Sequence, residues 1–491
     1  MKSAGGERKV ILLLCLLGAV HTFIFSAAFP FFNNVDEHAH FDLVTKYAGG
    51  RFPRGLEPLA SAITNYFVLY DSHAFYWPAN QELPTPSWSA AAAGSGAGSN
   101  STFEWWPRLN YETGQPPLYY LLAGAWWQLG RACGWHGGQL LYWLRFLNVL
   151  FVGVLVWLGY LAGRLIFPEN ILFRIGVPAM IAVFPQTSFY SIQNDVLSPL
   201  AFGGLLILLV KFYRAEVPGG AAGVALGSMF AVTFLAKLTN VPFMAVAGVV
   251  VVLKLAQLFR AGRLRLAMPA IVGLGLCACL PAIAWMAWCR QAFGDFTGAG
   301  GKVAYLGWTV KPFAQWWHHP IFTLNGAWTF LSMVVASFWE GEFWWHGQPL
   351  SAPAANAIYV IGSLSLMGLA VWGLLSKRMA VVPLQRQAIW FCLATCAAGV
   401  AFLGLNSIMY DFHECFCPSR AVPYLTAGRM LLGAMIPVLM LCCFGLEYLL
   451  HTVKKGWVRP ALIAVAVLFS LAGEIAIDWP VFFSRYNWFH M

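Results

Sequence analysis

Charged residues are scarce in this sequence. Asp and Glu number 20 and Lys and Arg 30 in 491 residues, so charged side chains make up 10% of the chain, whereas hydrophobic residues make up 59%. A soluble domain of this length needs more charge than this to cover its surface. The composition excludes a soluble globular protein and predicts that lipid surrounds most of the chain.

Dense basic clusters of the kind that bind nucleic acid are also missing. The formal net charge is +10, but the Lys and Arg residues stand singly or in small groups between apolar runs. A surface for a nucleic-acid backbone gathers its cations on one face or along one helix. We therefore expect contacts with membrane lipids and none with nucleic acid.

Long apolar runs, by contrast, are abundant. A run of about 20 apolar residues spans a bilayer as a helix. About eleven such runs predict an all-α, polytopic transmembrane bundle, at 10–31, 140–162, 175–192, 195–212, 219–236, 241–259, 267–288, 354–375, 387–405, 428–450 and 460–477. Two further runs, 116–130 and 321–338, are short or interrupted by polar and aromatic residues. We expect these two to be extracytoplasmic interfacial or re-entrant helices.

The positions of Lys and Arg predict which loops face the cytoplasm, because short cytoplasmic loops collect basic residues. If 116–130 and 321–338 do not cross, one side of the membrane holds 17 of the 30 basic residues and only four of the 20 acidic ones. That side includes the N-terminus and the loop from Arg260 to Arg265.

Function is expected in the long loops on the other side, which are extracytoplasmic in this topology. These loops lie at 32–139, 289–353 and 406–427. Within the first, the Gly- and Ser-rich stretch 84–102 predicts a flexible excursion.

The densest group of titratable side chains follows the first apolar run, in the segment NNVDEHAHFD that begins at Asn33. Asp36 and Glu37 are adjacent carboxylates at a low-dielectric boundary, where their pKa values can be pushed apart and one can act as a general base. We expect both to be catalytic and His40 to bind substrate. The alternative is a solvated helix end that carries interfacial charges.

Further candidates lie at the outer ends of apolar runs. Asn194 and Asp195 separate two runs; a carboxylate there should be paired or face a wet cavity, although helix capping also accounts for it. Arg429 begins a late run and could hold a phosphate through two hydrogen bonds, with snorkelling to the headgroups as the alternative. Lys237 is a weaker candidate by the same logic.

Metal binding is left open by the sequence. The segment from Asp411 to Cys417 contains ligand types, but it lacks the paired C-x2-4-C or H-x3-5-H spacing of zinc sites. Cys415 and Cys417 could instead form disulfide bridges, for example with Cys133. Two neighbouring carboxylates could hold a divalent cation, yet nothing in the sequence requires a cofactor.

Taken in order, four features resemble the GT-C superfamily, which comprises polytopic glycosyltransferases that use polyprenyl-phosphate sugars. The features are Asp36-Glu37 after the first run, Gln115-Pro116-Pro117, Asn194-Asp195 and Gly428-Arg429. The resemblance covers residues 10–445. Within the superfamily the chain is similar to the protein O-mannosyltransferase and aminoarabinose transferase branch, and to a group of bacterial predicted membrane proteins.

The resemblance implies an enzyme of the bacterial inner membrane with an extracytoplasmic site. It implies that Asp36 deprotonates or orients the acceptor, that Asp195 is a second acidic position, and that Arg429 contacts the donor phosphate. The other residues that would bind substrate are His40, Gln115, Asn194 and Lys237. Neither the sugar nor the acceptor can be read from these residues.

The expected organisation has two parts. A catalytic-type module at 1–290 carries the large first outer loop, and residues 291–491 supply a further outer loop and the remaining spans. We expect no separate soluble domain, so outer loops or a partner would recognise the acceptor.

Two other functions fit parts of the pattern. A transporter or flippase would place polar residues near the midplane of the membrane and show inverted repeats. A non-catalytic subunit of envelope assembly would keep the motifs only as structural caps. The gathering of charge at one face favours the transferase.

The charge pattern makes a direct prediction about topology. A cysteine introduced at Gly262 should react only with reagent that reaches the cytoplasm, and one introduced at His136 only with reagent outside. Accessibility labelling of intact cells and inverted vesicles measures this. Labelling of position 262 from outside would reverse the topology and the sidedness of the site.

Overall fold

The computed structural model describes residues 4–33, 36–89, 109–376, 379, 381–415 and 418–487. Two sequence predictions fall partly outside these residues. They are the flexible excursion at 84–102, from residue 90 onward, and the Asp411 to Cys417 segment at its last two positions.

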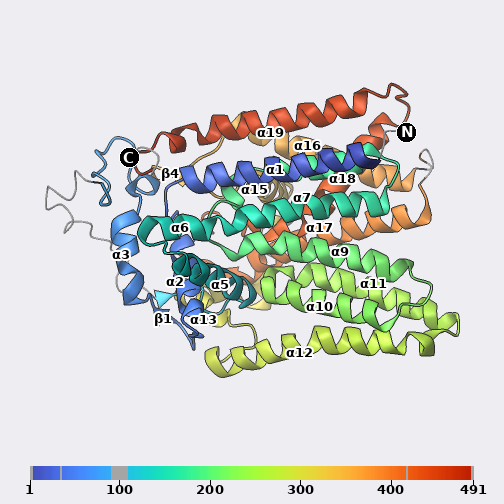
Figure 1. Cartoon of the computed structure of the whole chain (residues 1–491), viewed down its shortest axis with the longest axis horizontal. Coiled ribbons are helices and arrows are strands. Elements are labelled where there is room, and N and C mark those ends of the chain that lie inside the picture. The colour runs from blue at the N-terminus through green and yellow to red at the C-terminus, as the bar shows by residue number, and fades with distance from the viewer. Residues whose placement is uncertain are drawn as a thin grey trace.

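Long apolar helices dominate the described chain and lie side by side along its longest axis (Figure 1). Nine helical segments there are long and apolar enough to cross a membrane. Together with the turns that lead into some of them, they are α1 (Ala4–Ala28), α6 with α7 (Gly137–Arg145 and Leu147–Ile166), α9 (Ser198–Arg214), α11 (Val241–Arg260), α12 (Met268–Phe293), α16 (Pro353–Leu375), α17 (Pro383–Met409), α18 (Met435–Leu450) and α19 (Val458–Phe482). The prediction of an all-α polytopic bundle is confirmed.

The predicted count of eleven spans is approximate. Two of the eleven runs form shorter apolar helices, at Leu172–Ala182 and Gly220–Ala236. The first comprises a π-helical turn, η3 (Leu172–Gly176), and α8 (Val177–Ala182), and the second is α10. The run 175–192 is therefore helical over only part of its length. After α8 it continues as an irregular buried segment with a 3-10 turn, η4 (Gln186–Ser188).

Proline marks the start of several membrane helices. α9, α11, α12, α16 and α17 each carry a proline in the first turn. A proline there loses no helical hydrogen bond, because the first N–H groups of a helix have no intrahelical acceptor. These starts are therefore encoded locally in the sequence.

The two ambiguous runs form α5 (Leu118–Ala132) and α15 (Leu324–Glu340), and neither belongs to the nine segments suited to crossing. α5 lies at one end of the bundle beside α2 (Glu37–Ala48), together with α3 (Ser61–Tyr70) and α13 (Gly300–Tyr305) (Figure 1). This arrangement agrees with a layer of helices at one end of the bundle.

The remaining described elements are short. Three two-residue antiparallel pairs among them join β1 (Glu57–Pro58) to β2 (Leu109–Asn110), β3 (Thr309–Val310) to β6 (Tyr410–Asp411), and β4 (Trp344–Trp345) to β5 (Gln348–Pro349). Short helical turns are α14 (Phe313–Trp316), η1 (His73–Phe75), η5 (Asn194–Leu197), η6 (Leu238–Asn240), η7 (Leu264–Ala267) and η8 (Pro320–Phe322), and the longer η9 (Gly428–Ala434) leads into α18.

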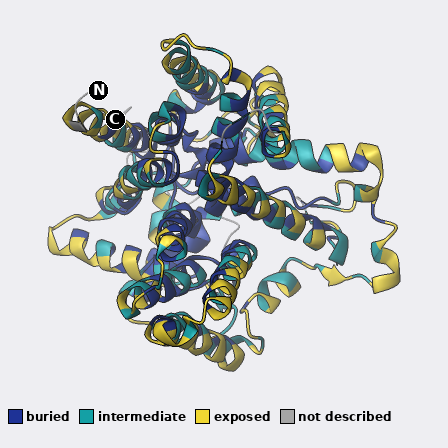
Figure 2. Cartoon of the chain, turned by 90° about the vertical axis from the view of Figure 1, so that its right-hand side faces the viewer, coloured by how far each residue is buried: buried dark blue, intermediate teal, exposed yellow. Residues whose placement is uncertain are grey.

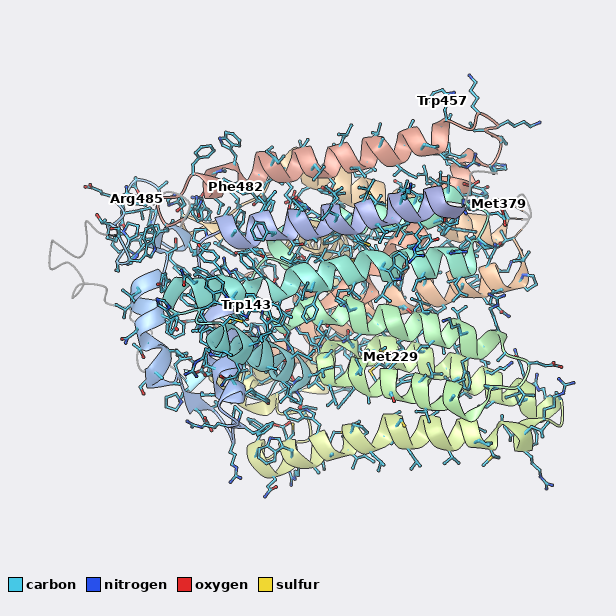
Figure 3. The ribbon with its side chains drawn as sticks, viewed as in Figure 1. Trp143, Met229, Met379, Trp457, Phe482 and Arg485 are labelled. Carbon is cyan, nitrogen blue, oxygen red and sulfur yellow. The ribbon has the colours of Figure 1, made fainter. Side chains whose placement is uncertain are left out.

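The helices differ in how far they are enclosed. Trp457 and Met379 lie at the end of the bundle that bears the N-terminus, whereas Phe482 and Arg485 lie at the opposite end (Figure 3). Buried residues concentrate along the centre of the bundle and exposed ones around it (Figure 2). Over an 18-residue apolar stretch of the α9 span and of the α18 span, 78% and 72% of the residues are buried, so these helices form the core. In the corresponding stretches of α12 and α19 the share is 11%, as expected for helices that face lipid.

The peripheral helix α19 makes its few buried contacts mainly through polar side chains. Its buried residues are Ser470, Glu474, Asp478 and Val481, which lie on one face. The Ser470 hydroxyl donates to the Val183 carbonyl at 2.8 Å, and Glu474 Oε2 lies 2.7 Å from Nε2 of His21 in α1. We call Ser470, Glu474 and Asp478 the polar stripe; its members Ser470 and Glu474 fasten this helix to the bundle.

The helices α10 and α12 approach each other through glycine. A Cβ added to Gly223 would overlap the backbone of Ala270, and one added to Gly227 would overlap that of Leu274. Small residues four apart allow such close backbone contact between membrane helices, where packing drives association. This pair of glycines sets the distance between α10 and α12.

Enlarging Gly223 should therefore separate the two helices. We expect Gly223→Val to destabilise the protein by about 1 to 3 kcal/mol, the usual cost of overpacking, and to lower the apparent melting temperature in detergent. Gly248→Val in α11 is the matched control, since nothing lies within 4 Å of its added Cβ. Equal melting temperatures for the two variants would contradict this packing.

Candidate functional site

Asp36 stands at the start of α2 in an uncommon backbone conformation. Its φ and ψ of 63° and 13° are left-handed, and its side chain makes no capping hydrogen bond to the helix. Instead the Tyr111 hydroxyl donates to Asp36 Oδ1, and Nη2 of Arg429 lies 3.3 Å from Oδ2. The carboxylate is therefore directed toward residues distant in sequence.

Arg429 is the centre of a charge cluster drawn from four parts of the chain. Its Nε donates to Glu342 Oε2 at 2.9 Å, and its Nη1 lies 3.6 Å from Asp195 Oδ2. With the contact to Asp36, this one guanidinium faces three carboxylates while its side chain is only 17% exposed. Snorkelling to lipid headgroups does not describe it, because the charge is directed into the protein.

Two further ion pairs extend the cluster on either side. Lys237, between α10 and η6, pairs with Asp195, whose side chain is fully buried. On the other side Lys302 of α13 pairs with Glu112.

Two amides link these ion pairs. Nε2 of Gln115 donates to Glu112 Oε2 at 2.6 Å, and Nδ2 of Asn194 donates to Gln115 Oε1 at 3.1 Å. Gln115 and Asn194, both predicted from the sequence, therefore belong to the same network.

His40 lies on α2 one turn after Asp36 and contacts Tyr120, whose hydroxyl is 2.8 Å from Nδ1. Burial lowers the pKa of His40 to about 4, against the opposing influence of Glu112 and Asp36. At neutral pH His40 is therefore a neutral hydrogen-bonding group and carries no charge of its own.

The carboxyl groups of the cluster divide into two kinds. Burial alone would raise the pKa of Asp36 and of Glu112, but Lys302 acts on both and Arg429 on Asp36, and each pKa falls below its usual value. Glu342 differs, since burial outweighs Arg429 and raises its pKa. Asp36 is thus firmly ionised at neutral pH, whereas Glu342 takes a proton more readily than Asp36 or Glu112.

Negative charge exceeds positive charge in this group. Four carboxylates and three cations come together among the described residues. We call these seven residues the charge cluster: Asp36, Glu112, Asp195, Glu342, Lys237, Lys302 and Arg429. Because His40 is neutral, the fully ionised cluster carries one net negative charge.

Glu37 is not brought into the charge cluster. Both of its oxygens bind Arg145 of α6, Oε1 with Nε at 2.8 Å and Oε2 with Nη2 at 2.8 Å, and both side chains are fully buried. Glu37 Oε2 also accepts from the Phe32 amide at 2.8 Å. The adjacent carboxylates Asp36 and Glu37 thus have separate partners and do not form a chelating pair.

No metal centre is formed by the described residues: no three His, Cys, Asp or Glu side chains among them come together as ligands. Cys133 and Cys415, considered above for disulfide bridges, are free thiols.

Four members of the site are not identified by the sequence analysis: Tyr111, Glu112, Lys302 and Glu342. Tyr111 and Glu112 stand just before Gln115, so the available signal was the polar segment YETGQ that they share with it. Lys302 and Glu342 come from the long segment 289–353, where no spacing connects them to Asp36.

The chain belongs to the DUF2142 family of predicted membrane proteins, whose model matches residues 17–410. Six of the seven charge-cluster residues lie within the match, and Arg429 lies beyond it. No curated protein matches the chain. One similar solved structure is that of ArnT from Cupriavidus metallidurans bound to undecaprenyl phosphate, with 12% identity, 96% of this chain and 86% of that chain covered, and a TM-score of 0.33.

The placement of Glu37 predicts a structural phenotype for its neutral variant. Glu37→Gln leaves Arg145 as a buried charge without its counter-ion, which should cost about 3 to 5 kcal/mol of stability. The exposed Glu82→Gln is the control. Thermal unfolding in detergent measures both. A Glu37→Gln protein that is as stable as wild type but inactive would speak for a catalytic role of Glu37 instead.

Proposed function

We propose that this protein is a membrane glycosyltransferase that moves a sugar from a polyprenyl-phosphate donor to an acceptor outside the cytoplasm. The observation that carries the proposal is the contact between Arg429 and Asp36. It joins a cation suited to a phosphate and a carboxylate suited to accept a proton, and the helix that Asp36 begins lies at the end of the bundle opposite the N-terminus (Figure 1). The ordered resemblance to GT-C enzymes supports the same function.

Arg429 is the donor-phosphate ligand in this proposal. A lipid-linked donor stays in the bilayer, so its phosphate has to meet a cation near the membrane boundary. A guanidinium offers two parallel N–H donors to one phosphate in a place with little water. Lys237 and Lys302, each paired with a carboxylate of the cluster, add positive potential around the leaving phosphate.

Asp36 is the general base. As the acceptor oxygen bonds to the anomeric carbon, its proton passes to Asp36, the bond from that carbon to the phosphate oxygen breaks, and polyprenyl phosphate leaves with the electron pair. Attack opposite the leaving group inverts the anomeric configuration. The base and the leaving phosphate must then lie on opposite faces of the sugar. Bound substrates therefore separate Asp36 from Arg429, whose Nη2 lies 3.3 Å from the carboxylate in the free protein.

Separation of Arg429 from Asp36 also changes the basicity of Asp36. Against the opposite effect of burial, Lys302 and Arg429 hold the pKa of Asp36 below its usual value, which keeps it ionised but weakly basic. When Arg429 turns to the donor phosphate, Asp36 loses one of the cations that lower its pKa. Its basicity therefore rises when the donor is in place.

The base assignment predicts the behaviour of Asp36→Asn. Asn keeps nearly the same volume but accepts no proton at neutral pH, so sugar transfer should fall by about two to four orders of magnitude, with donor binding little changed. The measurement is single-turnover transfer from a panel of radiolabelled polyprenyl-phosphate sugars to cell-envelope material.

The matched control for this prediction is Asp71→Asn. Burial raises the pKa of Asp71 to about 8, so this carboxyl is mostly neutral at pH 7 and lies outside the charge cluster. Asp71→Asn should transfer sugar as wild type does. A folded Asp36→Asn protein with wild-type transfer would remove Asp36 from the reaction.

A further inference from the structure

The charge cluster is unbalanced before any donor arrives. Its four carboxylates and three cations leave one net negative charge, held in side chains that are mostly buried. A phosphodiester donor brings a further negative charge. Like charges in such a low-dielectric site repel strongly, so binding needs a compensating positive charge or the loss of a negative one.

Arg429 is the group over which phosphate and carboxylates compete. Three carboxylates of the cluster keep another cation once this guanidinium turns to a phosphate. Asp195 keeps Lys237, and both Glu112 and Asp36 stay under the influence of Lys302.

Glu342 depends on Arg429 more directly. Its Oε2 accepts from Nε of Arg429 at 2.9 Å, and Arg429 favours its ionised form. Turning the guanidinium toward a phosphate withdraws that influence and brings a phosphate anion close to the Glu342 carboxylate. Both changes favour protonation of Glu342.

We propose that Glu342 takes up a proton when a lipid phosphate binds Arg429, so that donor binding and protonation of this one carboxylate are coupled. This inference rests on the proposed function, because it takes Arg429 as the phosphate ligand. Glu342 is then a positioning residue: as a neutral acid it releases the guanidinium, and it does not touch the reacting atoms.

The surroundings of Glu342 favour it as the carboxylate that takes up the proton. Among the charged groups that act on it, Arg429 of η9 favours the ionised form, whereas Asp195 of η5 and Asp36 at the start of α2 oppose it. Burial is the largest influence and already raises the pKa of Glu342 in the free protein. Its side chain is 26% exposed, so a proton can reach it from water.

A second carboxyl close in sequence has different surroundings. Glu340 ends α15, Gly341 follows with a φ of 75°, and Glu342 then meets Arg429. Burial raises the pKa of Glu340 to about 7 as well, but Arg429 is not among the groups that act on it. Glu340 therefore serves as a natural control for Glu342.

The sign of the effect follows from linkage. A group that gains a proton on binding makes affinity rise as pH falls, by at most about tenfold per pH unit between its free and bound pKa values. Above the pKa of free Glu342, lipid-phosphate affinity should therefore fall as pH rises. Glu342→Gln mimics the protonated acid, so it should bind independently of pH in that window and more tightly than wild type at its alkaline end.

The experiment uses purified full-length protein and a polyprenyl methyl phosphodiester, a probe whose single charge does not titrate near neutral pH. Binding is measured from about pH 5.5 to about pH 9, and calorimetry in buffers of different ionisation enthalpy counts the protons taken up. We expect an uptake approaching about one proton in wild type and in Glu340→Gln, and none in Glu342→Gln.

The outcomes separate this inference from the proposed function. Binding to wild type without proton uptake, or with the same uptake in Glu342→Gln, overturns the coupling and leaves the function standing. Loss of the uptake in Glu340→Gln would assign the proton to Glu340, which also overturns the inference about Glu342. If wild type binds no phosphodiester lipid at any pH, the function itself fails. Where Glu342→Gln does not fold, a wild-type proton count of zero, or loss of the uptake in Glu340→Gln, still overturns the inference.

Discussion

The placement of the whole site depends on one buried guanidinium. Arg145 is fully buried and must satisfy its donors, because unpaired N–H groups in a low-dielectric interior are costly. It binds both oxygens of Glu37 and three backbone carbonyls at and after the end of α1, those of Ser26, Phe29 and Pro30. Glu37 Oε1 also accepts from the Ile192 amide at 3.0 Å. The end of α1, the start of α2, α6 and the segment before Asp195 are thus fixed around one charge, and Asp36 stands beside it.

The bundle was largely predictable, because hydropathy and the prolines in first turns are local signals. Positions at the ends of apolar runs also sufficed to nominate four residues that the fold brings into contact, namely Asp36, Asp195, Lys237 and Arg429. Local signals could not predict in which direction each of these side chains points. Asp36 and Glu37 are neighbours in sequence, yet the left-handed backbone at Asp36 and the start of α2 send one to the charge cluster and the other to Arg145. Lys302 and Glu342 join the site only through contacts between distant loops, which one sequence does not reveal.

The charge cluster also unites the two parts expected from the sequence. Four of its members come from the first 290 residues and three from the rest. The contacts of Arg429 with Asp36 and Asp195 cross that division, as does the pair of Lys302 with Glu112. The first part alone holds three carboxylates and one cation and the second holds one carboxylate and two cations, so each part needs the other to pair its buried charges.

The polar stripe of α19 bears on how the protein is made. Because α19 follows His21 and Val183 in the sequence, it enters the bilayer after its partners have been synthesised. Until it docks, the polar stripe faces hydrocarbon or lipid headgroups, where a carboxyl is poorly solvated. In the assembled bundle Glu474 pairs with His21, and Ser470 donates to the Val183 carbonyl. A chain whose earlier helices had packed wrongly would therefore leave the Glu474 carboxyl inside the membrane without His21, so the order of synthesis makes docking of α19 depend on the packing of α1.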